Sequence, residues 1–448
     1  DDTVELRREA GRQAKAALGR DFHRFVEGVR AQRIETLGTA GFFLRHQLEP
    51  PRVLVSSAAH YSWAKGMKVL GLGTGQLVHV AVDDHMRLDV SDLRARLDEL
   101  QEARVPVLAV VGMLGTTEFG TVDPIHEIVD ERARRRADGF DFAIHVDGAW
   151  GGYLASVFRT REGGWREQSE MKVGYTYFPG DVVYRAFTAV PRVDAVTVDP
   201  HKLGYVPYPA GAFVSRNLDT VDFIVQDAAY VFDVAGDAPP PDTRKKLHNL
   251  GQYILEGSKP GASAAAVWVT HNVLPLDHEG LGRILRLTIR ACETFWDAVR
   301  EHAEAWEGRV RIRTPFEPDS NLICLALNPE GNTSVAEMNR FTRAIFKRMK
   351  VDPEQPVQVK EFIGSYTSMT KAALPGSQAD RILEELGLDP ATFVHAPEDP
   401  EVEADHLYIL RHTVMNPWQL SGPEGGSYIE RYFDWLGSVV AEELSRRG

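Results

Sequence analysis

Three short polar segments follow apolar runs of the sequence and combine residue types that could bind a small molecule. They are SSAAHY at 56–61, IHVDGAW at 144–150 and VDPHKLGY at 198–205. Each begins at the end of an aliphatic run, and open α/β sheets bind ligands where their strands end. Small residues beside Asp147 and Lys202 would let a ligand approach the backbone closely.

Metal-assisted hydrolysis is one chemistry that such a set could perform. The possible ligands are His60, His145, Asp147, Asp199 and His201. Neighbouring residues of a strand face opposite sides of a sheet, and the sequence offers no HxH or HxxxH pair to start a metal cage. The pattern therefore disfavours a metal site.

Pyridoxal phosphate (PLP) chemistry fits the same residues better. This cofactor needs a lysine that forms a Schiff base, a carboxylate that keeps the pyridine nitrogen protonated, and a flat group that stacks on the ring. Lys202, Asp147 and His60 are of the three types required.

The elements that would position these residues alternate along the chain in an α/β pattern. Between residues 53 and 215, β-rich runs alternate with helical runs, which predicts parallel strands joined by crossover helices in a doubly wound sheet. The predicted strands are 53–57, 76–82, 107–112, 142–147, 193–199 and 210–215, and the helices are 61–70, 92–104 (capped by Ser91) and 124–137.

The pattern changes near residue 310, where the sequence predicts a smaller α+β domain. A long helix at 281–305 would bridge the two domains. We therefore divide the chain into an incomplete helical N-terminal segment (1–50), a large domain (51–305) and a small domain (306–448). The small domain has predicted strands at 310–314, 321–327 and 407–414, and helices at 335–349, 377–386 and 430–446.

Composition excludes several classes of protein. The 448 residues carry a net charge of −13 with no basic stripe, which disfavours nucleic acid as a partner. The apolar run at 105–114 is far shorter than the roughly 20 residues that span a bilayer, and no signal segment opens the chain. We expect a cytoplasmic protein in which Cys292 and Cys324 are reduced core residues.

These motifs, in this order, resemble the group II PLP-dependent amino-acid decarboxylases, and within them the bacterial tyrosine decarboxylase branch. The resemblance rests on HVDGAWGG at 145–152, DPHK at 199–202, HYSW at 60–63, KLGYVPY at 202–208 and YILEGSKPGA at 253–262. It is specific between residues 50 and 290 and looser up to LRHTVMNP at 410–417. It implies a fold type I, aspartate-aminotransferase-like large domain with a smaller C-terminal α+β domain.

The resemblance also implies roles for single residues around the cofactor. Lys202 would be the Schiff-base lysine, and Asp147 the partner of the pyridinium nitrogen. His60 would stack on one face of the ring and Ala149 would pack against the other. His201 would lie beside the cofactor.

Other residues would complete this implied site. Tyr208 would reach the side of the site that holds the lysine, and either Tyr208 or His60 would be the final proton donor. Ser258 would approach the phosphate from a partner subunit. Thr117, with Thr116, would lie near the cofactor and the substrate carboxylate, although a simple capped turn is an equal alternative.

The family's phosphate-binding turn is the feature that this sequence does not match. The only turn before His60 is GTAG at 38–41, and its surroundings differ from the family's motif. Three explanations are open: the turn comes from a missing N-terminal segment, it comes from another chain, or the phosphate is held differently. We favour the first two. The resemblance also implies a homodimer and a loop at 230–247 that closes over the site.

The expected function is decarboxylation of an L-amino acid, tyrosine or another aromatic or apolar one, to the amine and CO2 by a carboxy-lyase. Two alternatives use the same scaffold. One is another PLP reaction, such as decarboxylation-dependent oxidative deamination or aldolase-type cleavage. The other is a non-catalytic subunit with this fold.

Overall fold

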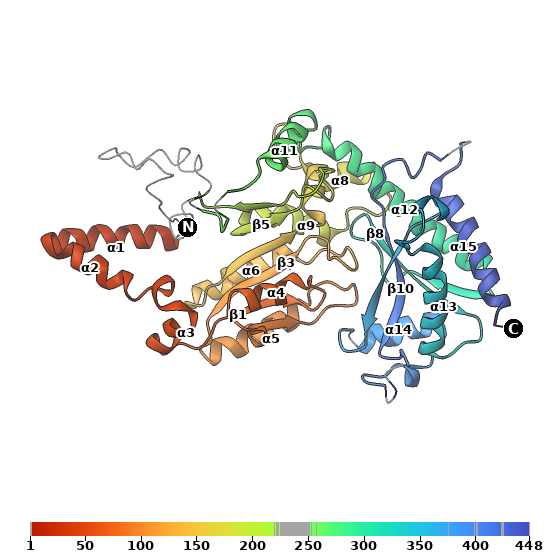
Figure 1. Ribbon diagram of the computed structural model, residues 1–448, viewed down its shortest axis with the longest axis horizontal. Helices are drawn as coiled ribbons and strands as arrows, with labels where there is room; N and C mark the ends of the chain where they lie inside the picture. Colours follow the sequence, from red (N-terminus) through yellow and green to blue (C-terminus); the bar gives the residue numbers. More distant parts are fainter. Residues whose placement is uncertain are drawn as a thin grey trace.

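The computed structural model contains two β-sheets, one in each half of the chain, with helices packed around both (Figure 1). It describes residues 2–218, 258–374, 376–397, 402–422 and 425–447, together with 220, 224, 251, 253–256 and 399. The loop predicted at 230–247 lies outside these residues.

The first sheet has six strands in the order β2-β1-β3-β4-β5-β6. All neighbouring pairs are parallel except β5 and β6, which pair antiparallel at one edge. Strand β1 is buried almost throughout and β3 is buried from Val110 to Met113, whereas side chains of β4 alternate between buried and more exposed positions and those of β5 are half-buried. The strands are β1 (Arg52–Ser56), β2 (Leu77–Val80), β3 (Val107–Met113), β4 (Ala143–Gly148), β5 (Ala195–Val198) and β6 (Ala212–Ser215).

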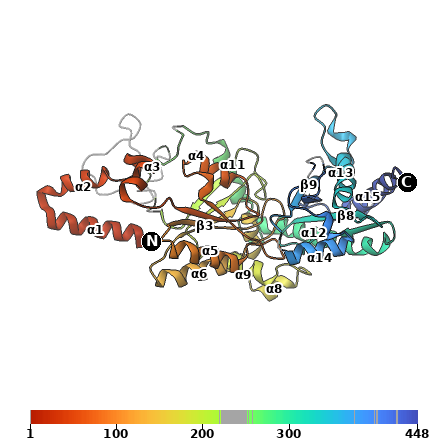
Figure 2. The ribbon, with the colours of Figure 1, turned by 90° about the horizontal axis from the view of Figure 1, so that it is seen from below.

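Helices cover both faces of this sheet, with α4 and α11 on one side and α5, α6 and α9 on the other (Figure 2). The predicted doubly wound architecture is therefore confirmed. Asp89, and not Ser91, caps α5, because the Asp89 carboxylate accepts the backbone N–H of Ser91. The helices are α4 (Ser62–Val69), α5 (Val90–Glu102), α6 (Ile125–Ala137), α7 (Ala155–Phe158), α8 (Gln168–Lys172), α9 (Asp181–Ala189) and α11 (Ala262–Val273).

The second sheet is antiparallel, with strand order β7-β8-β10-β9. Side chains of β8 alternate between two cores: Ile323 and Leu325 face one that includes residues of α12 and α15, and Cys324 faces one that includes residues of α14. The elements are β7 (Val310–Arg313), β8 (Leu322–Pro329), β9 (Ser365–Thr370), β10 (His406–Thr413), α12 (Leu281–Ala305), α13 (Val335–Met349), α14 (Gly376–Leu386) and α15 (Tyr428–Ser445).

Three N-terminal helices precede β1 and extend away from the first sheet as an arm (Figure 1). They are α1 (Asp2–Leu18), α2 (Phe22–Arg30) and α3 (Ile34–His46). Among the side chains that the structure describes in this arm, none is buried. The arm therefore contributes little to the core of its own chain.

Two further expectations concern the whole chain. Cys292 and Cys324 are free and buried, as predicted, and burial raises the pKa of the Cys324 thiol to about 12. No helix in the described part of the chain combines the length and apolar character that crossing a membrane requires. The division at residues 50 and 305 stays a prediction, although the two sheets lie on either side of the second boundary.

Candidate active site

The residues predicted to do chemistry lie where the strands of the first sheet end. His60 follows β1, Asp147 is the penultimate residue of β4, and Lys202 follows β5. In the sheet order, β3 separates β1 from β4, and β4 is next to β5. The charges of Asp147 and Lys202 both act on the His60 imidazole. The fold therefore brings the three groups together at the carboxyl ends of the strands.

Two N–H groups fix the carboxylate of Asp147. The indole Nε1–H of Trp63 on α4 donates to Oδ2 at 3.1 Å, and the backbone N–H of Ala149 donates to Oδ1, also at 3.1 Å. Sequence reasoning quoted Trp63 as part of a motif but assigned it no role. Its contact with Asp147 spans 84 positions, and only the packing of α4 on the sheet reveals it.

Lys202 forms an ion pair with a residue that sequence reasoning considered only as a metal ligand. Its Nζ lies 2.9 Å from Oδ2 of Asp199, and its side chain is 29% exposed. The spacing of three positions in the DPHK turn is the signal that could have predicted this pair. The amine is therefore held in place while it remains accessible to a ligand.

The rings of His201 and Tyr208 pack against each other in a tilted arrangement beside this pair. Their ring centroids are 3.9 Å apart, and Nδ1 of His201 also contacts the carbonyl of Ala210. Nε2 of His201 lies 3.6 Å from Asp199. Tyr208 is 74% exposed, so its hydroxyl faces outward in the single chain.

His60 is half-buried, and burial lowers the pKa of its imidazole, although the charge of Asp147 acts in the opposite direction. Its Nδ1 lies 2.8 Å from the hydroxyl of Ser62. Near it, the Oγ of Ser57 is buried without a hydrogen-bond partner among the described residues. A neutral imidazole and a free hydroxyl thus lie at the end of β1.

Thr116 and Thr117 have different surroundings. The Thr116 hydroxyl is buried and pairs with that of Thr121 at 2.8 Å, so it is a turn-stabilising group. The carbonyl of Thr117 accepts two N–H groups of Arg411, from Nε at 2.9 Å and Nη2 at 2.6 Å. Burial lowers the pKa of Arg411, and sequence reasoning did not single this residue out.

Two predicted features do not join this cluster in the described chain. Ser258 lies on an exposed segment, and its predicted contact with the phosphate requires a partner subunit. The GTAG turn at 38–41 lies inside α3, where Gly38 forms a kink with φ of 71° and an added Cβ would meet no atom within 4 Å. This turn therefore has no enclosed surroundings that could hold a phosphate.

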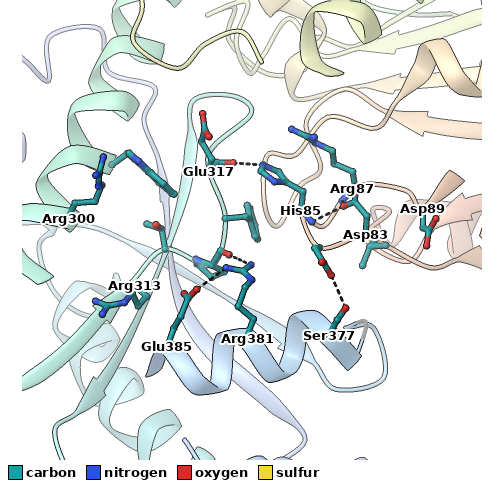
Figure 3. A pocket seen from close by; sticks show the side chains of 16 residues that line it. Asp83, His85, Arg87, Asp89, Arg300, Arg313, Glu317, Ser377, Arg381 and Glu385 are labelled. Carbon is teal, nitrogen blue, oxygen red and sulfur yellow. Dashed lines mark hydrogen bonds and ion pairs between the residues drawn. The ribbon is translucent and has the colours of Figure 1, made fainter. Parts of the chain in front are cut away.

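A cavity of about 1100 Å³ lies between the two halves of the chain. Figure 3 shows the residues that line it. Its walls include His85, Arg87, Arg300 and Arg381, and none of the predicted site residues lines it. Arg87 donates to the buried Asp319 from Nε at 2.7 Å, which ties the loop after β2 to the second half of the chain. We interpret this region as a contact between the two halves of the chain.

The donor set at the strand ends fits PLP. It includes an accessible amine (Lys202), a half-buried carboxylate with fixed orientation (Asp147), an imidazole whose pKa is lowered by burial (His60) and a hydroxyl without a partner among the described residues (Ser57). The segments after β3 and β4 approach each other so closely that only glycine fits at position 151, because a Cβ there would lie 2.3 Å from the Leu114 carbonyl oxygen. In the described part of the chain, no three His, Cys, Asp or Glu side chains are grouped to hold a metal ion.

Solved structures support the predicted fold type I architecture. Mouse CSAD superimposes with a TM-score of 0.59 at 17% identity, covering 97% of this chain and 76% of that one. TDC of Oryza sativa, solved with PLP and tryptamine, gives a TM-score of 0.61 at 13% identity, covering 91% and 67%. These similarities concern the fold.

Sequence comparisons match both halves of the chain. The L-tyrosine decarboxylase of Levilactobacillus brevis is 32% identical over 378 residues, which are 82% of this chain and 57% of that protein. That of Enterococcus faecium is 33% identical over 403 residues, or 88% and 62%. The chain thus spans about three-fifths of the length of these relatives.

Two family models match separate parts of the chain. Residues 29–170 match the pyridoxal-dependent decarboxylase conserved domain, and residues 291–441 match the tyrosine decarboxylase C-terminal domain. The first contains His60 and Asp147, and the second contains Arg411. The chain therefore contains a pyridoxal-dependent decarboxylase domain in its first half and a tyrosine decarboxylase C-terminal domain in its second half.

Proposed function

We propose that the protein decarboxylates an L-amino acid, tyrosine or another aromatic or apolar one, to the corresponding amine and CO2 with PLP. The proposal rests on one observation: Lys202, Asp147 and His60 lie together at the carboxyl ends of the strands of the first sheet. Relatives named L-tyrosine decarboxylase support the choice of reaction and of an aromatic substrate.

Lys202 and Asp147 would hold the cofactor at its two reactive ends. Bound PLP supplies a conjugated ring that accepts the electron pair left behind when CO2 departs. The carboxylate of Asp147, fixed by Trp63 and Ala149, would keep the ring nitrogen protonated, which favours electron uptake. Asp199 would keep the Lys202 amine in position and compensate its charge.

Arg411 would bind the carboxylate of the amino acid. It reaches the Thr117 carbonyl from the opposite half of the chain, and its Nη1 lies 3.2 Å from the Ser365 hydroxyl, so its hydrogen bonds among the described residues go to neutral groups. A half-buried guanidinium whose hydrogen bonds go to neutral groups is stabilised by a bound carboxylate. Its remaining N–H groups could form that pair.

The proton that replaces CO2 would come from His60 or Tyr208. His60 would also stack on the cofactor ring, opposite Ala149. The ring of Tyr208 packs on His201, which lies beside Asp199. Tyr208 would therefore belong to the site if substrate binding buried the segment that carries it. His201 would then act as a positioning residue for Tyr208.

A homodimer would complete the site. The arm α1–α3 and helix α11 expose large apolar side chains, among them Leu44 (83%), Trp268 (68%) and Val273 (72%). A second copy of the chain could bury these surfaces and bring Ser258 to the phosphate. Sedimentation of the PLP-loaded protein tests this, and an active monomer would exclude it. A cytoplasmic location also stays a prediction.

Product analysis tests the proposed reaction directly. The PLP-loaded protein is incubated with L-tyrosine, L-phenylalanine, L-tryptophan and L-leucine in turn, and amine, aldehyde and CO2 are quantified. We expect amine and CO2 in equal amounts for an aromatic substrate, and no product from the Lys202→Ala variant. An aldehyde as the main product would indicate oxidative deamination, and no turnover of any amino acid would favour the non-catalytic alternative.

A further inference from the structure

Tyr153 is buried beside the turn at 199–204, which carries the lysine of the candidate site. It belongs to a short 3₁₀ helix, Gly151–Leu154, that follows β4. This helix packs against the end of β5, because a Cβ on Gly152 would clash with the side chain of Val198. The turn begins directly after Val198, so the Tyr153 ring lies against the residues that lead to the lysine.

The contact between Tyr153 and this turn is close. A Cβ on Gly204 would lie 2.8 Å from Cζ of Tyr153, the ring atom that carries the hydroxyl. It would also lie 2.6 Å from the carbonyl oxygen of Pro200, which accepts the backbone N–H of Val206 at 2.9 Å. Only glycine therefore fits here, and the hydroxyl end of the Tyr153 ring limits how far the turn can move.

The charge of the turn also acts on the phenol. Asp199 forms the ion pair with Lys202, with 2.9 Å between Oδ2 and Nζ. Burial raises the pKa of Tyr153 to about 12, and the charge of Asp199 acts in the same direction. The phenol is therefore protonated near pH 7, and it lies within electrostatic range of the carboxylate that holds the Lys202 amine.

The hydroxyl of Tyr153 has its hydrogen-bond partner on another element, the helix α11. It lies 3.0 Å from Nε2 of His271, and the two ring centroids are 5.6 Å apart. Burial lowers the pKa of His271, so its imidazole is neutral near pH 7 and one ring nitrogen accepts a hydrogen bond. The phenol O–H shows no other acceptor among the described residues, so it donates to Nε2 of His271.

This hydrogen bond anchors α11 to the first half of the chain. No side chain of α11 is fully buried. Among the described residues, the pair of Tyr153 and His271 is the one side-chain hydrogen bond that the structure shows between α11 and the rest of the chain. α11 begins at Ala262, four positions after Ser258, which the resemblance brings to the phosphate. The pair therefore connects that segment with the turn that carries the lysine.

We propose that Tyr153 and His271 are positioning residues for Lys202. His271 holds the Tyr153 ring in place. The ring keeps the turn in the conformation in which Asp199 pairs with Lys202. The two residues act through the turn and not by contact with the substrate. The inference rests on the proposed function, because it assigns both residues to the lysine that would bind PLP.

The absorbance of lysine-bound PLP as a function of pH reports on this positioning. A carboxylate beside the protonated Schiff-base nitrogen raises the pKa of that nitrogen, so a displaced Asp199 lowers it. The other titratable groups of the cluster, which are present in every variant compared, are Asp147, His60, His201 and Tyr208.

The test compares the PLP-loaded full chain with single variants of the pair. Tyr153→Phe and His271→Phe remove the hydrogen bond but keep a ring, and each should lower the midpoint of the absorbance transition by about 0.5–1 pH unit. His271→Gln keeps an acceptor for the phenol and should shift the midpoint less than His271→Phe does. Tyr184→Phe is the matched control, since the half-buried Tyr184 hydroxyl donates to the carbonyl of Arg166 at 2.9 Å, and it should leave the midpoint unchanged.

Thermal melting of every variant checks that the fold is retained. His271 is only half-buried, so its two variants test the link even if Tyr153→Phe does not fold. An unchanged midpoint in His271→Phe, an equal shift in Tyr184→Phe, or equal shifts in His271→Gln and His271→Phe would each overturn the proposal. If the unmodified protein shows no absorbance of lysine-bound PLP, the proposed function itself is wrong, and not only this positioning role.

Discussion

Replacing Trp63 with phenylalanine removes the one side-chain hydrogen bond that the structure shows to Asp147. The indole N–H lies 3.1 Å from a carboxylate oxygen, and hydrogen bonds to charged groups contribute about 1.5–3 kcal/mol. Both side chains are only half-buried, so we take the lower end of this range. About 1.4 kcal/mol corresponds to a factor of 10 in binding.

We therefore expect Trp63→Phe to raise the Kd for PLP about 10-fold, because the carboxylate that meets the ring nitrogen is less well oriented. The measurement is a fluorescence titration of PLP-free protein with PLP. Trp306→Phe is the matched control, since Trp306 lies buried in the helical core beside the second sheet. It should lower the melting temperature but leave PLP affinity within about 2-fold. Equal PLP affinity in Trp63→Phe and the unmodified protein would refute the positioning role of Trp63.

Three other substitutions test different parts of the reasoning. Asp147→Asn should retain some PLP at saturating concentration, with a Kd raised at least as much as in Trp63→Phe, but lower kcat/KM about 1,000-fold, because an amide cannot stabilise a protonated ring nitrogen; steady-state kinetics and PLP titration measure the two effects. Arg411→Gln should lower kcat/KM for the amino acid 10- to 100-fold (about 1.5–3 kcal/mol) with unchanged PLP affinity, and an unchanged kcat/KM would remove Arg411 from the site. His126→Phe should reduce acid sensitivity. Burial, followed by the charge of Arg185, lowers the pKa of His126 from 6.5 to about 4, so the unfolded chain takes up a proton first as the pH falls. This group then removes up to about 3 kcal/mol of stability between pH 6.5 and pH 4, and denaturant unfolding at both pH values should show a smaller loss in the variant.

Much of the first sheet could be predicted because its strands read as short apolar runs, among which β1 and most of β3 are buried. The predicted strand at 107–112 and the observed β3 at Val107–Met113 differ by one residue. The antiparallel direction of β6 could not be read, since a short strand has the same composition in either direction. The strand β9 was missed because its sequence, SYTSMT, is largely polar, and its six pairs with β10 alone define it.

The candidate site was predictable in its residue types but not in its contacts. Lys202, Asp147 and His60 stand out because polar residues follow apolar strands. Their partners do not: Trp63 and Arg411 lie 84 and 294 positions from the residues they contact. Such pairs depend on how α4 and β10 pack on the first sheet, and no local pattern records that packing.

Chemical trapping of the cofactor tests the central claim most directly. The PLP-loaded protein is reduced with borohydride, digested, and analysed by mass spectrometry to locate the modified lysine. We predict a pyridoxyl group on the peptide that contains Lys202, and no adduct in Lys202→Ala. An adduct on Lys65 or another lysine, or none at all while PLP remains bound, would contradict the proposed role of Lys202.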